Sequence, residues 1–192
     1  MLFRSDEIER TAKIPDHVIK GLFELGAFGM KIPKEYGGLG YSHKNYGRVL
    51  TLIASWSNIL ALTVAVPQSI GIAMPILLFG NEEQKKRYLP RVAREDVSAF
   101  ALTEPMTGSD AANIQTEAVL DSSGRHFLVN GEKLWCTNGT VAEIIVVMAR
   151  HTDSGKISAF IVEMDWPGVE VVQRLHFMGL GGIENRSEEH NV

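Results

Sequence analysis

The sequence contains a single cysteine, Cys136, among 192 residues, so a framework of internal disulfides is excluded. Its six histidines show no paired spacing of the kind that a metal site needs. Lysine and arginine do not cluster and the formal net charge is −4, which argues against a nucleic-acid-binding protein. Charged residues begin at Arg4, so no secretory signal peptide is predicted. What remains is typical of a folded protein, with 45% hydrophobic and 22% charged residues.

One long stretch almost lacks charge. Residues 58–80 approach the length of a membrane-spanning helix. However, the stretch contains Pro67 and Pro75 and leads directly into a charged segment. We therefore predict two short buried helices that meet near Pro67, and no integral membrane segment.

The first half of the chain has a helical pattern. Apolar residues between Asp16 and Phe28 follow one helical face, and Gly29 is the expected stop. Ser42 is placed to cap a helix that runs towards Trp56. Asn81-Glu-Glu-Gln84 has the spacing of a capping box and opens a helix to about Val92.

After Arg94 the pattern changes to short runs rich in β-branched and aromatic residues, separated by turn residues. Asn130-Gly131 is the strongest hairpin indication among the turns. The expected fold class is α+β: an N-terminal helical bundle domain over residues 6–95, followed by an antiparallel β-sandwich or barrel over residues 96–185. We expect both domains to be incomplete.

Two motifs carry the chemistry. The first is Phe100-Ala-Leu-Thr-Glu-Pro-Met-Thr-Gly-Ser109, a loop shaped by Pro and Gly and rich in small hydroxyls. The second is Trp135-Cys-Thr137, at the end of the run that begins with Asn130-Gly131. Together they resemble the flavin-binding motifs of the acyl-CoA dehydrogenase family. The resemblance extends over about residues 16–185, and Gln68-Ser-Ile-Gly71 is most similar to the very-long-chain branch of that family.

The resemblance implies a FAD site without a dinucleotide-binding βαβ unit. Leu102 and Thr103 would hold the pyrimidine side of the isoalloxazine, Trp135 would lie against the ring, and the Thr137 hydroxyl would reach N5. Ser109 would contact both FAD and the acyl-CoA substrate. The full set of cofactor-binding residues implied in this way is Phe100, Leu102, Thr103, Gly108, Ser109, Trp135, Cys136 and Thr137.

Seen alone, each residue also has a plainer interpretation. Thr103 and Ser109 are common turn residues, and a Trp on a hairpin strand usually lies in a core. Strand alternation directs Cys136 away from its two neighbours, so we interpret its side chain as packing and not as a nucleophile. Glu104 has a structural part in the family, and no residue of this chain matches the family's catalytic base. That base belongs to a C-terminal helical domain that this sequence does not contain.

The implied function is FAD-dependent α,β-dehydrogenation of long-chain acyl-CoA thioesters in fatty-acid β-oxidation, with electron-transfer flavoprotein as acceptor. The whole enzyme would be a homo-oligomer of the bacterial cytoplasm or the mitochondrial matrix. We expect the 192-residue chain to be inactive alone and to bind FAD weakly. Alternatives are an acyl-CoA oxidase or flavin monooxygenase on the same scaffold, a non-catalytic assembly relative, and a lipid-binding module.

The two ends of the chain share a further pattern. Leu2-Phe-Arg-Ser5 can be encoded by CTCTTCCGATCT, and Arg186-Ser-Glu-Glu189 by the reverse complement of that string, which occurs in sequencing adapters. We therefore expect residues 1–5 and 186–192 to be non-native. Resequencing of the source gene tests this: a genomic continuation from Asn185 into Arg-Ser-Glu-Glu-His would contradict it.

Overall fold

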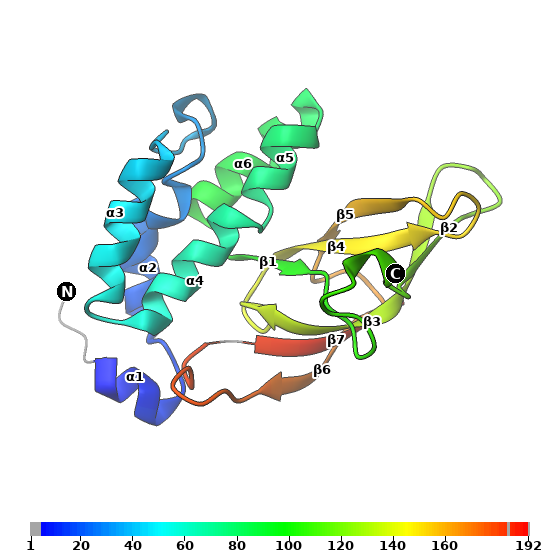
Figure 1. Ribbon diagram of the computed structural model, residues 1–192. Coiled ribbons are helices and arrows are strands. Elements are labelled where there is room, and N and C mark those ends of the chain that lie inside the picture. Colours follow the sequence, from blue (N-terminus) through cyan, green and yellow to red (C-terminus); the bar gives the residue numbers. More distant parts are fainter. Residues whose placement is uncertain (1–4, 184, 192) are drawn as a thin grey trace. The chain divides into compact units, whose positions relative to one another are not determined.

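The computed structural model describes residues 5–183 and the backbone of residues 185–191 (Figure 1). Residues 1–4 of the predicted non-native N-terminal end lie outside the described residues. The chain divides into two compact units, one extending to Ser98 and including His176–Ile183, the other formed by Ala99–Leu175 and the segment after Ile183. A helical unit followed by a β unit confirms the predicted α+β fold class.

The helical unit contains six α-helices and two short 3-10 turns among its described residues. Their bounds are α1 (Ser5–Thr11), α2 (Asp16–Glu24), α3 (His43–Ala54), α4 (Asn58–Ser69), α5 (Ala73–Phe79) and α6 (Glu82–Arg94), with turns η1 (Ala27–Gly29) and η2 (Lys34–Tyr36). Within this unit α3 packs on α4, and α5 packs on α6.

Both predicted helix caps are present. The Ser42 side chain accepts a hydrogen bond from the Asn45 N–H at the start of α3. Asn81 and Gln84 form the complete capping box of α6, at 2.8 and 2.9 Å. The prediction was wrong at the end of α2, which stops at Glu24 because Gly26, with φ of +71°, turns the chain before Phe28.

The uncharged stretch forms two helices, as predicted. Asn58–Phe79 has the length and apolar composition of a membrane span. The structure breaks it into α4 and α5 and buries Leu60, Val64 and Ala73, as expected of core helices. The break lies after Ser69; Pro67 remains inside α4, in its last turn.

The described residues of the β unit form one sheet of seven strands. The bounds are β1 (Ser98–Ala101), β2 (Glu117–Leu120), β3 (Phe127–Thr137), β4 (Ile144–His151), β5 (Ile157–Glu163), β6 (Val169–Leu175) and β7 (Asn185–Asn191). The strand order is β1-β4-β2-β3-β7-β6, and β5 pairs with β4. The assigned pairs β2–β3, β3–β7, β4–β5 and β6–β7 are antiparallel, whereas β2 and β4 are parallel, a pairing that the turn spacing did not indicate.

The hairpin predicted at Asn130-Gly131 is wrong, because β3 runs without a break through both residues. The chain turns earlier instead, at 121–126, where Gly124 has φ of +68°. Gly131 is required for a different reason. A Cβ built on it would lie 2.5 Å from the Thr116 Oγ1 and 2.7 Å from the Thr116 Cα, so the glycine permits a close approach of the segment that leads into β2.

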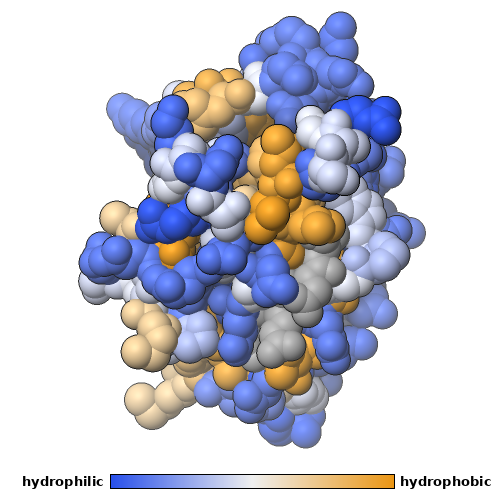
Figure 2. Space-filling model, turned by 90° about the vertical axis from the view of Figure 1, so that its right-hand side faces the viewer, coloured by the Kyte–Doolittle hydropathy of each residue, from blue (hydrophilic) through white to orange (hydrophobic). Residues whose placement is uncertain are grey.

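The hydrophobic core of the β unit is formed mainly by side chains of β1, β2, β3, β4 and β5. Its buried members include Ala118, Val129, Cys136, Ile145 and Val147. Other apolar side chains remain on the surface, among them Leu120, Leu128 and Val172. Figure 2 shows one face of the molecule, on which hydrophobic residues gather near the centre and most of the other coloured residues are hydrophilic.

The segment His176–Ile183 belongs to the helical unit. Ile183 is buried in the same cluster as Ile8 and Ile59, and a Cβ on Gly182 would lie 2.6 Å from the Ile8 Cγ2. The predicted β domain, residues 96–185, includes this segment in sequence.

Candidate functional site

The two predicted motifs lie against each other in the β unit. The Thr103 carbonyl accepts a hydrogen bond of 2.7 Å from the Leu134 N–H, which places the loop beside the residue that precedes Trp135. Leu102 and Thr103 are both half-buried at this contact. A backbone hydrogen bond therefore joins the two motifs, which are distant from each other in the sequence.

The Trp135 side chain is exposed and is not part of the core of the β unit. Its side chain is 57% exposed, which rules out the plainer interpretation of a core Trp on a hairpin strand. Its φ is +57°, a left-handed conformation that is costly for a bulky residue, by about 1–3 kcal/mol. The cause is local: the register between β3 and β7 shifts between Lys133 and Cys136, so Leu134 and Trp135 form a bulge.

The bulge explains which way its neighbours face. Cys136 is buried in the core of the β unit, at 1% exposure, while Thr137 is half-buried. The prediction that Cys136 faces away from Trp135 and Thr137 as a packing residue is thus in agreement with the structure. Because its thiol lies in the core, Cys136 has only its backbone to offer to a ligand.

The loop itself is closed by a tight turn. Glu104 and Thr107 bond each other through both backbone pairs, at 2.8 and 3.1 Å, which leaves Pro105 and Met106 at an exposed tip. Gly108 and Ser109 follow the turn on the surface, and Phe100 is half-buried at the end of β1. The predicted residues therefore occur as two groups: Phe100, Leu102 and Thr103 lead into the turn next to β3, and Gly108 and Ser109 leave it.

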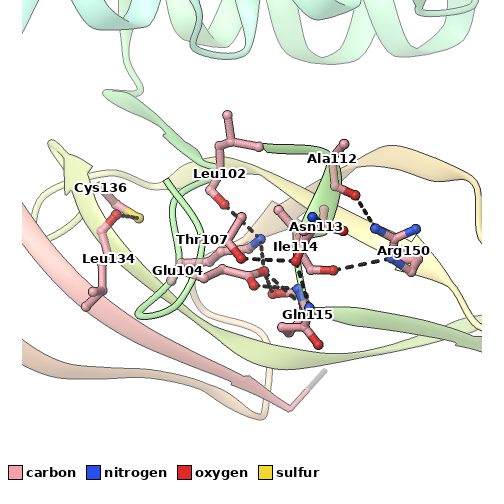
Figure 3. Close-up of polar contacts among 12 residues, drawn as sticks. Leu102, Glu104, Thr107, Ala112, Asn113, Ile114, Gln115, Leu134, Cys136 and Arg150 are labelled. Carbon is pink, nitrogen blue, oxygen red and sulfur yellow. Dashed lines mark hydrogen bonds and ion pairs between the residues drawn. The ribbon is translucent and has the colours of Figure 1, made fainter. Parts of the chain in front are cut away.

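The loop is held by a buried ion pair, which sequence reasoning missed. The Lys133 ammonium lies 2.7 Å from the Glu104 Oε1 and also donates to the Leu102 carbonyl at 3.2 Å (Figure 3). Lys133 is fully buried and Glu104 is 5% exposed. The only sequence indication was that Glu104 lies inside the first motif and that Lys133 lies two residues before the second.

Glu104 has more partners than Lys133. Its carboxylate also accepts hydrogen bonds from the backbone N–H groups of Gln115 and Thr116 and from the Thr116 hydroxyl at 2.6 Å. Burial raises the pKa of the Glu104 carboxyl, but the hydrogen bonds from Lys133, Thr116 and the two amides outweigh that effect and hold the pKa below its ordinary value. Burial also lowers the pKa of the Lys133 ammonium, against the opposing effect of Glu104. Glu104 is therefore a charged structural anchor and not a proton acceptor for a substrate.

A second anchor lies beyond Ser109. The guanidinium of Arg150, on β4, donates to the carbonyls of Ala112 and Ile114, which fixes the segment between the loop and β2 (Figure 3). It also donates to the Gly155 carbonyl in the turn between β4 and β5. On the outer side of the loop, a hollow of about 300 Å³ is bordered by residues of the turn, of β2 and of β3. Among the residues that the structure describes, no group of three or more His, Cys, Asp or Glu side chains is placed to hold a metal ion.

Comparisons with known proteins place both units in one family. Residues 3–96 match the model of the acyl-CoA dehydrogenase N-terminal domain, and residues 99–189 match that of the acyl-CoA dehydrogenase middle domain. A probable acyl-CoA dehydrogenase, FadE10 of Mycobacterium bovis, is 50% identical over 182 residues, which are 93% of this chain and 28% of the relative. The mitochondrial very long-chain specific acyl-CoA dehydrogenase of Macaca fascicularis is 42% identical over 165 residues, which are 81% of this chain and 25% of that protein.

Solved structures give the same result. The crystal structure of an acyl-CoA dehydrogenase complexed with FAD from Bacillus anthracis matches with a TM-score of 0.86 and 38% identity, over 97% of this chain and 31% of the other. The chain thus spans between a quarter and a third of the length of these relatives. Both family models apply in the order in which the two units occur, so the chain belongs to the acyl-CoA dehydrogenase family.

Proposed function

We propose that the β unit holds the isoalloxazine ring of FAD between the Leu102–Thr103 loop and the Trp135–Thr137 segment. In the whole protein this site would serve the α,β-dehydrogenation of acyl-CoA thioesters. The observation that carries the proposal is the 2.7 Å bond from the Leu134 N–H to the Thr103 carbonyl, which brings together two segments that are each matched to a flavin contact by family resemblance.

The residues fit a flat aromatic ligand. Trp135 presents a large, 57% exposed ring in a strained backbone conformation, and such strain commonly accompanies a binding role. Aromatic rings gain from offset stacking on a ligand ring. The relative from Bacillus anthracis was determined with FAD bound, and its fold superimposes over 97% of this chain.

Bound FAD would supply hydride acceptance, which no protein side chain provides. The chain's own residues would position the ring. Because Leu134 already engages the Thr103 carbonyl, the proposal assigns the ligand contact at Thr103 to its N–H and hydroxyl. Hydrogen-bond donors beside the pyrimidine part of the isoalloxazine would stabilise negative charge on that part of the ring. The Thr137 hydroxyl would serve the opposite side of the ring, and exposed Ser109 would contact both FAD and acyl-CoA.

No catalytic base is assigned within the chain. Glu104 is the acidic residue nearest to the motif in sequence, but its carboxylate is occupied by Lys133, Thr116 and two backbone amides. We therefore propose that the 192-residue chain does not turn over acyl-CoA by itself. Dehydrogenation by the purified chain would contradict this part of the proposal.

The finer assignments follow the resemblance. Identity to a very long-chain specific enzyme supports long acyl chains as substrates. Electron-transfer flavoprotein is the proposed acceptor, the whole enzyme is proposed to be a homo-oligomer, and bacterial and mitochondrial relatives support the cytoplasm or the mitochondrial matrix as its location. The same scaffold would also suit an acyl-CoA oxidase, a flavin monooxygenase or a non-catalytic assembly relative. A test of the full-length protein with dioxygen and with an artificial dye separates these enzymes. An oxidase or monooxygenase should react with dioxygen, whereas a dehydrogenase should reduce the dye.

Titration of FAD with the purified chain tests the binding step. Since Trp135 would stack on the isoalloxazine, flavin fluorescence should be quenched on binding and the flavin absorption band should shift. The affinity is expected to be weak, because the chain spans between a quarter and a third of the length of the relatives. Free FMN is the matched ligand for asking whether the ring alone suffices. Unquenched fluorescence and an unshifted band at saturating protein would show that the β unit does not take a flavin.

A further inference from the structure

We infer that the buried Glu104–Lys133 pair is a positioning device that sets the Leu102–Thr103 loop in register with the Trp135 ring. The inference rests on the proposed flavin site and deepens it, because it assigns a role to two residues outside the proposed set of cofactor-binding residues. It also makes a claim about the chain that holds without any flavin present.

The register arises from two consecutive contacts. Lys133 donates through its ammonium to the Leu102 carbonyl at 3.2 Å, and the next residue, Leu134, donates through its N–H to the Thr103 carbonyl at 2.7 Å. Two neighbouring residues of β3 thus hold two neighbouring residues of the loop. Trp135 is the next residue on β3. Its backbone position relative to the loop is therefore fixed by the hydrogen bond of its neighbour Leu134.

The bulge makes this connection possible. Between Lys133 and Cys136 the pairing of β3 with β7 shifts, so Leu134 lies outside the regular pairing. Its N–H is directed to the loop. A bulge redirects a strand locally and leaves the extra residue unpaired in the ladder. The loop, and not the neighbouring strand, therefore determines where this part of β3 lies.

Glu104 fixes the other end of the pair. Its carboxylate bridges the Lys133 ammonium and the Gln115–Thr116 backbone, so the loop is tied to β3 and to the segment before β2 by one side chain. A buried ion pair adds little net stability compared with a well-packed apolar pair, because both charges must lose their hydration. Its geometric demands are strict, however, and it specifies one arrangement of the groups that it connects.

Amide hydrogen exchange of the full 192-residue chain tests the register without flavin. Lys133→Met and Glu104→Gln each break the pair, and the double variant Glu104→Gln/Lys133→Met removes both charges so that no ion is left buried alone. We expect the Leu134 N–H to lose protection by roughly tenfold or more in each, while amides of the β4 core such as Val147 keep theirs. The exposed Lys156→Met is the matched control. Unchanged protection of Leu134 in folded single and double variants would overturn the inference.

Flavin binding provides the second measurement. In the double variant the FAD dissociation constant should rise by roughly tenfold, the lower end of the loss typical when a residue that orients a ligand-contacting group is removed. The absorption band of the bound flavin should also shift, which a loss of stability alone would not cause. A double variant that loses Leu134 protection but binds FAD with wild-type affinity and spectrum would overturn the positioning role. If the wild-type chain bound no FAD, the proposed function would fail, whereas the exchange result would still decide whether the pair sets the register.

Discussion

The Leu134 N–H and the Thr103 carbonyl are joined by a hydrogen bond of 2.7 Å that links a loop to the one irregular point of the longest strand. Leu134 lies at the bulge, where the regular pairing of β3 with β7 is interrupted. There the loop gains a fixed partner and Trp135 takes up its left-handed conformation. The left-handed backbone and the exposed side chain of Trp135 therefore occur at the same local departure from strand geometry.

Removal of the Trp135 ring should weaken FAD binding by about 1–2 kcal/mol, roughly the value of an aromatic stacking contact. Trp135→Ala tests this by flavin fluorescence titration. The matched control is Trp166→Ala, which removes another partly exposed Trp of the same unit, 41% exposed. Equal loss of affinity in both variants would indicate a general effect and would remove Trp135 from the site.

A glycine variant separates ring loss from unfolding. Trp135 has φ of +57°, a conformation that glycine adopts readily. Trp135→Gly should therefore keep the free energy of unfolding within about 1 kcal/mol of wild type, since relief of strain offsets the lost packing and the added chain entropy. Urea denaturation measures it. A large destabilisation would mean that the ring is needed for folding and that the strain argument is wrong.

Local features of this fold were readable from the sequence. The caps at Ser42 and Asn81 are decided by hydrogen bonds between residues three apart, and each was predicted correctly. The division into a helical and a β half followed from the change in period near Arg94. The end of α2 was missed because Gly26 and Gly29 are equally good helix stops in sequence, and only the position of the following turn selects the first.

Contacts between residues that are far apart in the chain could not be predicted from the sequence. Asn130-Gly131 has the composition of a tight turn, yet Gly131 lies inside β3. A glycine is needed there because Thr116 approaches its backbone closely. The Glu104–Lys133 pair likewise joins the first motif to the strand just before the second, and neither motif alone indicates a partner. The family resemblance indicated which residues we propose for the site. The structure adds the bonds that hold the two motifs together.

Substitution of Gly131 tests the close approach directly. Because a Cβ would meet the Thr116 side chain and its Cα at 2.5–2.7 Å, Gly131→Ala should destabilise the β unit by about 1–3 kcal/mol, as overpacking does. Gly108→Ala is the folding control, since nothing lies within 4 Å of the added methyl group. The midpoints of urea unfolding give the comparison. If Gly131→Ala were as stable as Gly108→Ala, the approach of Thr116 would not be the reason for a glycine here.

Gln68 offers a test in the helical unit. It is fully buried, accepts a hydrogen bond of 2.8 Å from the Lys31 N–H and donates to the Ala27 carbonyl. Gln68→Met would leave both backbone groups without these bonds, at a cost of about 1–3 kcal/mol for each group that stays buried and unsatisfied. Exposed Gln173→Met should change stability by less than about 0.5 kcal/mol. Thermal unfolding of both variants decides whether this glutamine, part of the motif Gln68-Ser-Ile-Gly71, is structural.

Acid should open the β2–β3 turn at an unusually low pH. The Ser123 hydroxyl and the backbone N–H groups of His126 and Arg125 donate to the Asp121 carboxylate and lower its pKa from the ordinary 3.8 to about 2. A carboxyl with a lowered pKa stabilises the fold fully above its unfolded pKa, and the contribution disappears as the pH falls through the folded value. The turn is thus intact above pH 3.8 and is lost towards pH 2. The Arg125 and His126 amide chemical shifts should move with a midpoint near pH 2, and Asp121→Asn should abolish that step. A midpoint at the ordinary value of 3.8 would show that these hydrogen bonds do not form in solution.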